Sequence, residues 1–138
     1  MFARFAEGRR PVKIEAVQAT NTATVLDHEQ LRDITLDDPD LMREILAALI
    51  DDTGRQIELL GGAIEDRDSQ RCIRLAHYSK GACANVGAVS SATLLKDIER
   101  EAAHDQFEAC SSALASLVTE LGRLREEAGA LAGAGSGY

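Results

Sequence analysis

The sequence predicts an all-α protein: an up-and-down bundle of four helices with a short additional helix near the N-terminus. The composition indicates helices, because 45% of the residues are hydrophobic but only 4% are aromatic, with no Trp and two Pro. Apolar residues also recur at three- and four-residue steps, and helix-capping residues separate these periodic segments. The 138 residues fit one domain that can bury a single core.

The first 26 residues carry no sustained helical pattern and are expected to form an arm, either mobile or packed along the body. Within this arm, PVKIEAV alternates apolar and polar side chains, as a short extended segment would, but no partner strand is evident. Asp27 followed by Gln30 predicts a capping box at the start of a short helix that ends near Ile34.

A long second helix is expected to begin in LDDPD. Asp38 can serve as its N-cap, and Pro39 suits the first helical position, where a missing N–H leaves no hydrogen bond unmade. One apolar stripe then continues to about Ile64 and should face the core. It consists of Met42, Ile45, Leu49, Thr53, Ile57, Leu60 and Ile64.

The third and fourth helices follow a turn predicted in EDRDS. Asp68 or Ser69 can cap the third helix, which should end near Gly87. The fourth is expected from about Ser90 to Ala103, with an apolar face formed by Leu94, Leu95, Ile98 and Ala102.

A fifth helix completes the predicted bundle. Asp105 and Glu108 form a second capping-box pattern, and an apolar stripe continues to a helix end near Ala130. Residues 132–138 are expected to be a flexible tail, which leaves residues 27–131 as the folded domain. Short connections favour an up-and-down order, with the short first helix across one end.

Charge and hydropathy restrict the possible partners. The net charge of −8 argues against nucleic-acid binding, which needs clustered Lys and Arg. No apolar run approaches the roughly 20 residues that span a bilayer, and the N-terminus lacks the apolar core of a secretion signal. We therefore expect a cytoplasmic protein with no membrane partner. Cys72, Cys83 and Cys110 show no metal-ligand spacing and are expected to be buried, reduced thiols.

The third helix carries an unusual stretch, AHYSKGACANVGA, from Ala76 to Ala88. On a helical wheel His77 lies opposite the apolar side, which comprises Leu75, Ser79, Ala82 and Val86 with Cys72 and Cys83 beside them. The residues around His77 are mostly small or basic, and Ile73 is the exception. They are Ile73, Arg74, Lys80, Gly81, Ala84 and Ala88.

This pattern can support nucleophilic chemistry at His77. A neutral imidazole is a competent nucleophile near pH 7. A glycine within a helix lowers the stability of that helix. At Gly81 it also leaves out a side chain that would crowd His77 from one direction. We therefore interpret Gly81 as a residue that gives a partner access to the imidazole.

The stretch resembles the signature of histidine-containing phosphotransfer (HPt) domains of phosphorelays, with a shape AHxLKGxxxxxGA. The matching residues are Ala76, His77, Lys80, Gly81, Asn85, Gly87 and Ala88, and the likeness extends over about residues 25–131, including Leu95, Ile98 and Glu99 in LLKDIEREA. Ser79 departs from the usual Leu, and we expect its hydroxyl to bond to the Leu75 carbonyl.

The resemblance implies a four-helix bundle that carries a phosphoryl group on His77 and exchanges it with aspartates of response-regulator receiver domains. The phosphoryl group would add about −1.5 to −2 charges, which Lys80 first and Arg74 second could stabilise. A hybrid sensor histidine kinase would feed the relay, and the receiver would supply Mg²⁺, so no cofactor of the chain's own is expected. Ile73, Ala84, Gly87 and Ala88 would form the receiver-docking face. The resemblance favours a monomer, and a chain of this length has no room for a kinase's nucleotide-binding domain, so we expect a phosphocarrier.

Two other interpretations stay open. The chain could be an HPt-like module that docks a partner without carrying phosphate. A ligand-binding or metal-binding bundle is a third possibility. Such a bundle would require several polar side chains that face its interior, or paired Glu-x-x-His motifs, and the sequence shows none. His28 and His104 are expected to be ordinary surface residues.

Overall fold

The computed structural model of the chain describes residues 24–136, which form five helices and no strand. The all-α prediction is therefore confirmed. Most of the expected N-terminal arm, residues 1–23, lies outside the described residues, as do residues 137 and 138 of the tail. The helices are α2 (His28–Ile34), α3 (Pro39–Glu65), α4 (Ser69–Val86), α5 (Val89–Ala103) and α6 (Phe107–Ser136).

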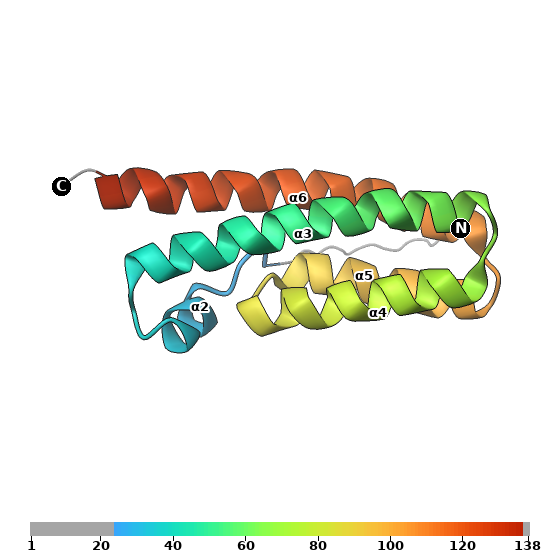
Figure 1. Cartoon of the computed structure of the whole chain (residues 1–138), viewed down its shortest axis with the longest axis horizontal. Helices are drawn as coiled ribbons and strands as arrows, with labels where there is room; N and C mark the ends of the chain where they lie inside the picture. Colours follow the sequence, from blue (N-terminus) through green and yellow to red (C-terminus); the bar gives the residue numbers. More distant parts are fainter. Residues whose placement is uncertain (1–23, 137–138) are drawn as a thin grey trace, which may run out of the picture.

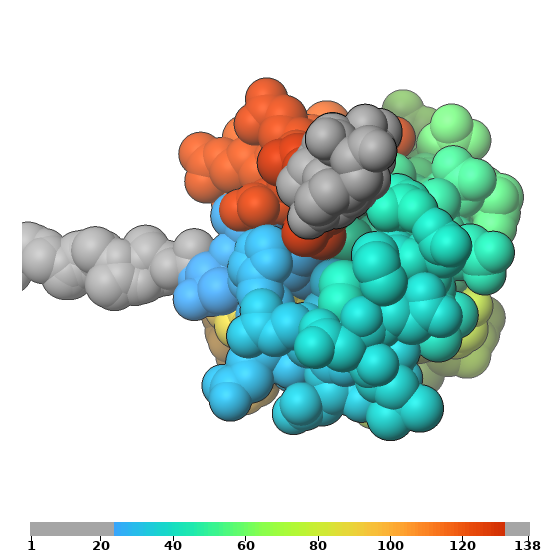
Figure 2. Space-filling model, turned by 90° about the vertical axis from the view of Figure 1, so that its left-hand side faces the viewer, coloured from blue at the N-terminus to red at the C-terminus, as the bar shows by residue number. Residues whose placement is uncertain are grey.

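Helices α3 to α6 form the predicted up-and-down bundle (Figure 1). Each helix packs against the next, and α6 returns to pack against α3, so the four helices enclose one core. The connections are short, which places consecutive helices antiparallel. Helix α2 contacts α4 and lies across one end of the bundle, where Figure 2 shows it beside the start of α3.

The core is aliphatic, with small side chains contributed by α4. The largest fully buried apolar side chains come from the other helices and include Leu31, Leu46, Leu60, Leu95, Ile98, Leu117 and Leu124. On α4 the buried residues are Cys72, Ala76, Ser79 and Cys83. The buried side of this helix therefore lies slightly further around the helix axis than predicted, because Leu75, Ala82 and Val86 are only partly buried.

Three predicted N-caps are present. Side chains of Asp27, Asp38 and Asp68 each accept a backbone N–H from the first turn of their helix. The reciprocal half of the first capping box is absent, because the Gln30 amide does not reach back to Asp27. It donates to the Ala84 carbonyl at 2.7 Å, and thereby fastens α2 to the end of α4.

Helix α6 differs from the prediction at both ends. Asp105 has a φ of +56° and lies in the turn, so it does not cap the helix. The Gln106 carbonyl accepts the Cys110 N–H instead, which places Gln106 at the capping position. At the other end the helix continues to Ser136, so most of the expected tail is helical.

The chain enters the bundle at a well-packed junction. Leu26 is buried, and the Asp27 N–H donates to the Gly87 carbonyl at 2.7 Å. The Thr24 carbonyl accepts both the N–H and the hydroxyl of Ser90, at 2.9 and 2.7 Å. The last residues of the predicted arm are therefore bound to the start of α5.

All three cysteines are buried and free, which confirms the prediction of reduced thiols. Removal from water raises the pKa of the Cys83 thiol and of the Cys110 thiol to about 11 each. The Cys110 thiol also donates to the Ile98 carbonyl at 3.7 Å. These thiols are protonated at neutral pH and serve as core side chains.

Candidate functional site

His77 lies on the outer surface of α4. The buried seam of Cys72, Ala76, Ser79 and Cys83 fixes the rotation of α4 about its axis and turns His77 outward. The His77 side chain is 67% exposed, so a partner protein can reach the imidazole.

Glu99 of α5 joins His77 to Lys80. Its Oε2 lies 3.0 Å from Nδ1 of His77, and its Oε1 accepts a hydrogen bond from Nζ of Lys80 at 2.8 Å. His77 and Lys80 are three positions apart on α4, which places both over the same carboxylate. The three side chains form one charged cluster across the α4–α5 seam.

The electrostatics of this cluster determine which imidazole nitrogen carries the proton. The hydrogen bond from the Lys80 ammonium lowers the pKa of the Glu99 carboxyl below its ordinary value, with a smaller contribution from His77. The carboxylate is thus ionised at neutral pH and can only accept hydrogen bonds. Nδ1 of His77 must therefore be the donor, and in the neutral ring Nε2 holds the free lone pair.

Sequence reasoning did not place Glu99 at the site. It noted Glu99 only as an acidic position in the family resemblance, because the contact joins residues 22 positions apart on different helices. A wheel of α5 offered a weak signal: Leu95, Ile98 and Ala102 face the core, and Glu99 follows directly at the edge of that face.

A groove of about 400 Å³ lies beside the cluster. It is lined by Ile73 and Lys80 of α4 and by Lys96, Glu99, Arg100 and Ala103 of α5. Ile73 was predicted to be part of a docking face, and it supplies an apolar wall here. The lining of this groove is partly apolar and partly charged, with more basic than acidic side chains.

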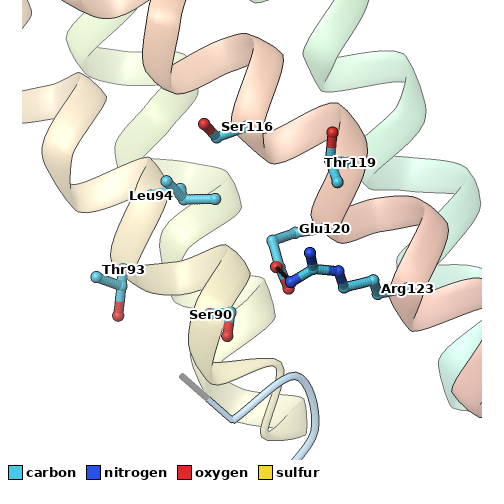
Figure 3. A pocket seen from close by; sticks show the side chains of 7 residues that line it. All are labelled: Ser90, Thr93, Leu94, Ser116, Thr119, Glu120 and Arg123. Atoms are coloured by element: carbon cyan, nitrogen blue, oxygen red, sulfur yellow. Dashed lines mark hydrogen bonds and ion pairs between the residues drawn. The ribbon is translucent and has the colours of Figure 1, made fainter. Parts of the chain in front are cut away.

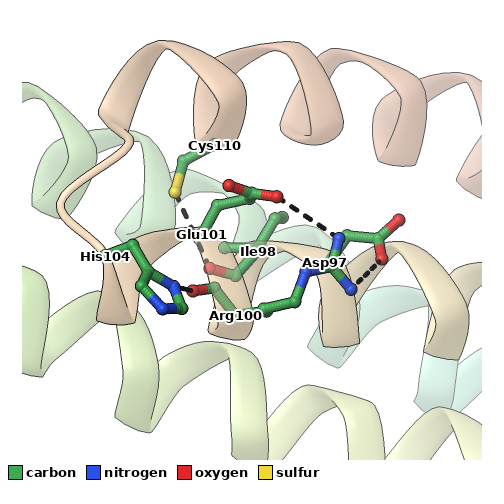
Figure 4. Close-up of polar contacts among 6 residues, drawn as sticks. All are labelled: Asp97, Ile98, Arg100, Glu101, His104 and Cys110. Atoms are coloured by element: carbon green, nitrogen blue, oxygen red, sulfur yellow. Dashed lines mark hydrogen bonds and ion pairs between the residues drawn. The ribbon is translucent and has the colours of Figure 1, made fainter.

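Arg100 lines the groove, and ion pairs with residues of its own helix hold its side chain. Its guanidinium lies 3.0 Å from Asp97 and 3.3 Å from Glu101 (Figure 4). Lys80 is thus the cation that shares a carboxylate with His77.

Arg74 and Gly81 have open surroundings. Arg74 is exposed, and within residues 24–136 its side chain makes no hydrogen bond or ion pair. A Cβ placed on Gly81 would meet no atom within 4 Å, so this glycine is not required by packing. Its role in access to His77 stays a prediction.

Gly87 and Ala88 do not belong to a docking face, and their prediction as such was wrong. Helix α4 ends at Val86, and Gly87 has a φ of +94°, so a wheel does not apply beyond that point. Both residues are buried. A Cβ on Gly87 would lie 3.0 Å from the Asp27 carbonyl oxygen, which shows that this glycine permits close packing of α2. Ala84 is exposed, as predicted.

The predicted hydrogen bond of Ser79 is absent. Its side chain is buried, but its Oγ has no hydrogen-bond partner among residues 24–136. Thr35, by contrast, does bond back to the carbonyl four residues earlier, at 2.7 Å. The Ser79 hydroxyl is therefore a destabilising group in the core.

The other two histidines have protein partners of a different kind. His104 Nδ1 donates to the Arg100 carbonyl at 3.0 Å, and His28 Nε2 lies 3.5 Å from Glu127 on α6. Neither shares a carboxylate with a lysine, so the cluster around His77 differs from both.

Within the described part of the chain, no group of three or more His, Cys, Asp or Glu side chains is arranged to hold a metal ion. None of the helices between residues 24 and 136 has an apolar stretch long enough to cross a membrane.

Comparison with known proteins gives one family and several similar structures. The family model of the Hpt domain matches residues 44–131. Histidine-containing phosphotransfer protein B of Pseudomonas aeruginosa PAO1 is similar with a TM-score of 0.71 and 23% identity, over 78% of this chain and 93% of that one.

Two plant structures show the same fold. A rice protein described as a histidine-containing phosphotransfer protein has a TM-score of 0.70 and 22% identity, over 78% of this chain and 79% of its own. The histidine-containing phosphotransfer protein MtHPt2 of Medicago truncatula has a TM-score of 0.69 and 24% identity, over 78% and 76%. A search of curated proteins found no match.

Proposed function

This chain belongs to the Hpt domain family, and we propose that it accepts a phosphoryl group on Nε2 of His77 from a receiver-domain aspartate and passes it to another receiver. The observation that carries the proposal is the His77–Glu99 contact. It engages Nδ1 and leaves Nε2 on an exposed ring as the nucleophile.

The transfer step follows from this geometry. The Nε2 lone pair attacks the phosphorus of the aspartyl phosphate, a phosphorus–nitrogen bond forms, and the phosphorus–oxygen bond breaks. The electron pair of the broken bond leaves with the aspartate carboxylate. The ring then carries positive charge, which the ionised Glu99 stabilises through the Nδ1 proton. Reversal of the same step delivers the phosphoryl group to a second receiver.

Lys80 is the residue we assign to the phosphoryl charge. It already lies over the carboxylate that His77 contacts, so a small rotation of its side chain can bring the ammonium to a phosphoryl group on Nε2. Arg74 is a second candidate because it is exposed one turn away and has no partner within residues 24–136. The Mg²⁺ that phosphoryl transfer needs would be held by the receiver.

The partners we propose are receiver domains of response regulators and of a hybrid sensor histidine kinase. The groove beside His77 supports this, because Ile73 offers an apolar contact and Lys80 and Lys96 offer cations to an acidic receiver site. We assign the docking face to this groove with Gly81 and Ala84.

The test is transfer from a phosphorylated receiver domain to this protein. The wild type should gain acid-labile, alkali-stable label, and His77→Gln should gain none. His28→Gln and His104→Gln are matched controls that remove one imidazole each and should label normally. Receiver binding without any label on the wild type would instead favour the docking module that carries no phosphate.

A further inference from the structure

A tyrosine lies beside His77 on the side of α4 that faces α3. Tyr78 is 56% exposed, and among the described residues it is the one large hydrophobic side chain of α4 that is exposed. On a helical wheel it falls about 100° from His77, whereas Lys80 falls about 60° from His77 in the opposite direction. His77 is therefore flanked by the charged cluster toward α5 and by an aromatic ring toward α3.

The hydroxyl of Tyr78 is held by α3. It donates to Oδ2 of Asp52 at 3.1 Å, and Nη2 of Arg55 lies 3.5 Å from Oδ1 of the same carboxylate. The bond to Asp52 raises the pKa of the Tyr78 phenol above its ordinary value, so the hydroxyl stays protonated and remains a donor. The hydroxyl and the carboxylate thus both have partners within the protein.

A tyrosine that is anchored in this way is well suited to be covered by a partner. Its ring is already ordered, so binding does not have to immobilise it. Its hydroxyl already has an acceptor, so an apolar side chain that covers the ring leaves no buried hydroxyl without a hydrogen bond. Asp52 and Arg55 also offset each other's charge, so this flank of His77 favours an apolar contact.

The surface between the two rings is open among the described residues. Gly81 falls between His77 and Tyr78 on the wheel, and a Cβ placed on it would meet no atom within 4 Å. A partner that reaches the imidazole can therefore contact the tyrosine ring as well. The two flanks differ in chemistry, because the groove toward α5 has more basic than acidic side chains and the flank toward α3 presents a ring.

We propose that Tyr78 is a receiver-docking residue, and that its ring packs against an apolar side chain next to the acidic phosphorylation site of the receiver. This inference rests on the proposed function, because it takes a receiver domain as the partner of His77. The acidic site faces His77 and the cations of the α5 flank, and the apolar side chain covers the ring. Asp52 is a positioning residue that acts through Tyr78.

Binding of an unphosphorylated receiver domain to the full chain tests the proposal, with the dissociation constant measured by isothermal titration calorimetry. Tyr78→Ala should raise this constant about 30-fold, the loss typical of an aromatic residue at the centre of an interface. Tyr78→Phe keeps the ring but removes its anchor, so it should raise the constant about 2- to 12-fold, the effect of ordering one side chain.

Variants of Asp52 test the positioning role. Asp52→Ala should weaken binding as much as Tyr78→Phe does, and the double variant should bind no more weakly than either single one, because both changes remove the same hydrogen bond. Asp52→Asn keeps an oxygen that can accept from the hydroxyl, so it should restore most of the affinity. Asp52→Ala with wild-type affinity would refute the positioning role.

Two variants of α6 are matched controls, because this helix packs against α3 and α5 and lies diagonally across the bundle from α4. Val118→Ala removes an exposed apolar side chain, as Tyr78→Ala does. Thr119→Val removes an exposed hydroxyl, as Tyr78→Phe does, and Figure 3 shows Thr119 in the groove between α5 and α6. Both variants should bind the receiver as the wild type does.

Equal affinity of the wild type and a folded Tyr78→Ala would overturn the proposal, and so would an equally large loss in Val118→Ala. Circular dichroism and urea unfolding establish that each variant is folded. The binding measurement needs no phosphoryl transfer. A wild type that binds the receiver but gains no label would therefore refute phosphotransfer, while the Tyr78 variants would still give their result. If no receiver domain binds the wild type, both proposals fail.

Discussion

Nδ1 of His77 and Oε2 of Glu99 lie 3.0 Å apart, on adjacent helices. Because the carboxylate also accepts from Lys80, it stays ionised and fixes the proton on Nδ1. One contact across the α4–α5 seam thereby leaves the Nε2 lone pair free. In the proposed function Nε2 is the nucleophile, and Glu99 provides a negative charge beside the phosphorylated ring.

Glu99→Ala should slow transfer from a receiver to His77. A hydrogen bond to a charged group contributes about 1.5–3 kcal/mol, which corresponds to a loss of about 10- to 150-fold in rate. Glu99→Gln should lose less, because its amide oxygen can still accept from Nδ1. Single-turnover transfer kinetics measure this. Equal rates for wild type and Glu99→Ala would show that the contact plays no part in the reaction.

The Glu99 carboxyl should also make stability depend on pH. Its pKa is lower in the folded protein, mainly because of the hydrogen bond from Lys80. The contribution is therefore full above the unfolded pKa of about 4.3 and is lost as the pH falls through the folded pKa below it.

Urea unfolding of wild type and Glu99→Gln can measure that contribution. The wild type should be more stable by at most about 1 kcal/mol at pH 7, because the pair is partly exposed, and the difference should shrink toward pH 3. Glu58→Gln is the control, since this exposed acid in the middle of α3 forms no ion pair within the described residues. A difference that does not change with pH would contradict the prediction.

The two glycines of the signature should respond to alanine in opposite directions. Gly81→Ala should raise the free energy of unfolding by about 0.5–1 kcal/mol, since the new methyl group meets open space and alanine favours helix. Gly87→Ala should lower it by at least about 1 kcal/mol, because the φ of +94° is strained for alanine and the methyl group would crowd Asp27. Thermal or urea unfolding distinguishes these outcomes, and a shift of both variants in the same direction would refute this account of the two positions.

Ser79→Ala should stabilise the protein by about 1 kcal/mol, because it removes a buried hydroxyl that has no hydrogen-bond partner in the described part of the chain. Ser69→Ala is a matched control. The Ser69 hydroxyl donates to the Ala102 carbonyl at 2.7 Å, so its loss should destabilise by a similar amount. Free energies from urea unfolding test both. A destabilised Ser79→Ala would mean that the hydroxyl has a role in the core.

Local signals predicted most of the fold. The caps at Asp38 and Asp68 and the apolar stripes determine where the helices begin and which side is buried, and these interactions span three or four residues. The end of α6 was missed because its Ala- and Gly-rich sequence gives no clear stop. The partner of Gln30 was missed because it lies 54 positions away.

The site could be predicted only in part, because one of its contacts also joins residues that are far apart in the sequence. His77 and Lys80 share a helix, so a wheel placed them together. Glu99 joins them from another helix, and no local pattern gives that distance. Gly87 and Ala88 were misplaced because the wheel was continued past Val86, where the chain leaves the helix.

The most direct test of the central claim is to identify the phosphorylated atom by NMR, through phosphorus–nitrogen couplings in ¹⁵N-labelled protein after transfer from a receiver. The account predicts a single phosphorus–nitrogen bond, at Nε2 of His77. Phosphorylation on Nδ1 of His77, on His28 or His104, or on no histidine would contradict it.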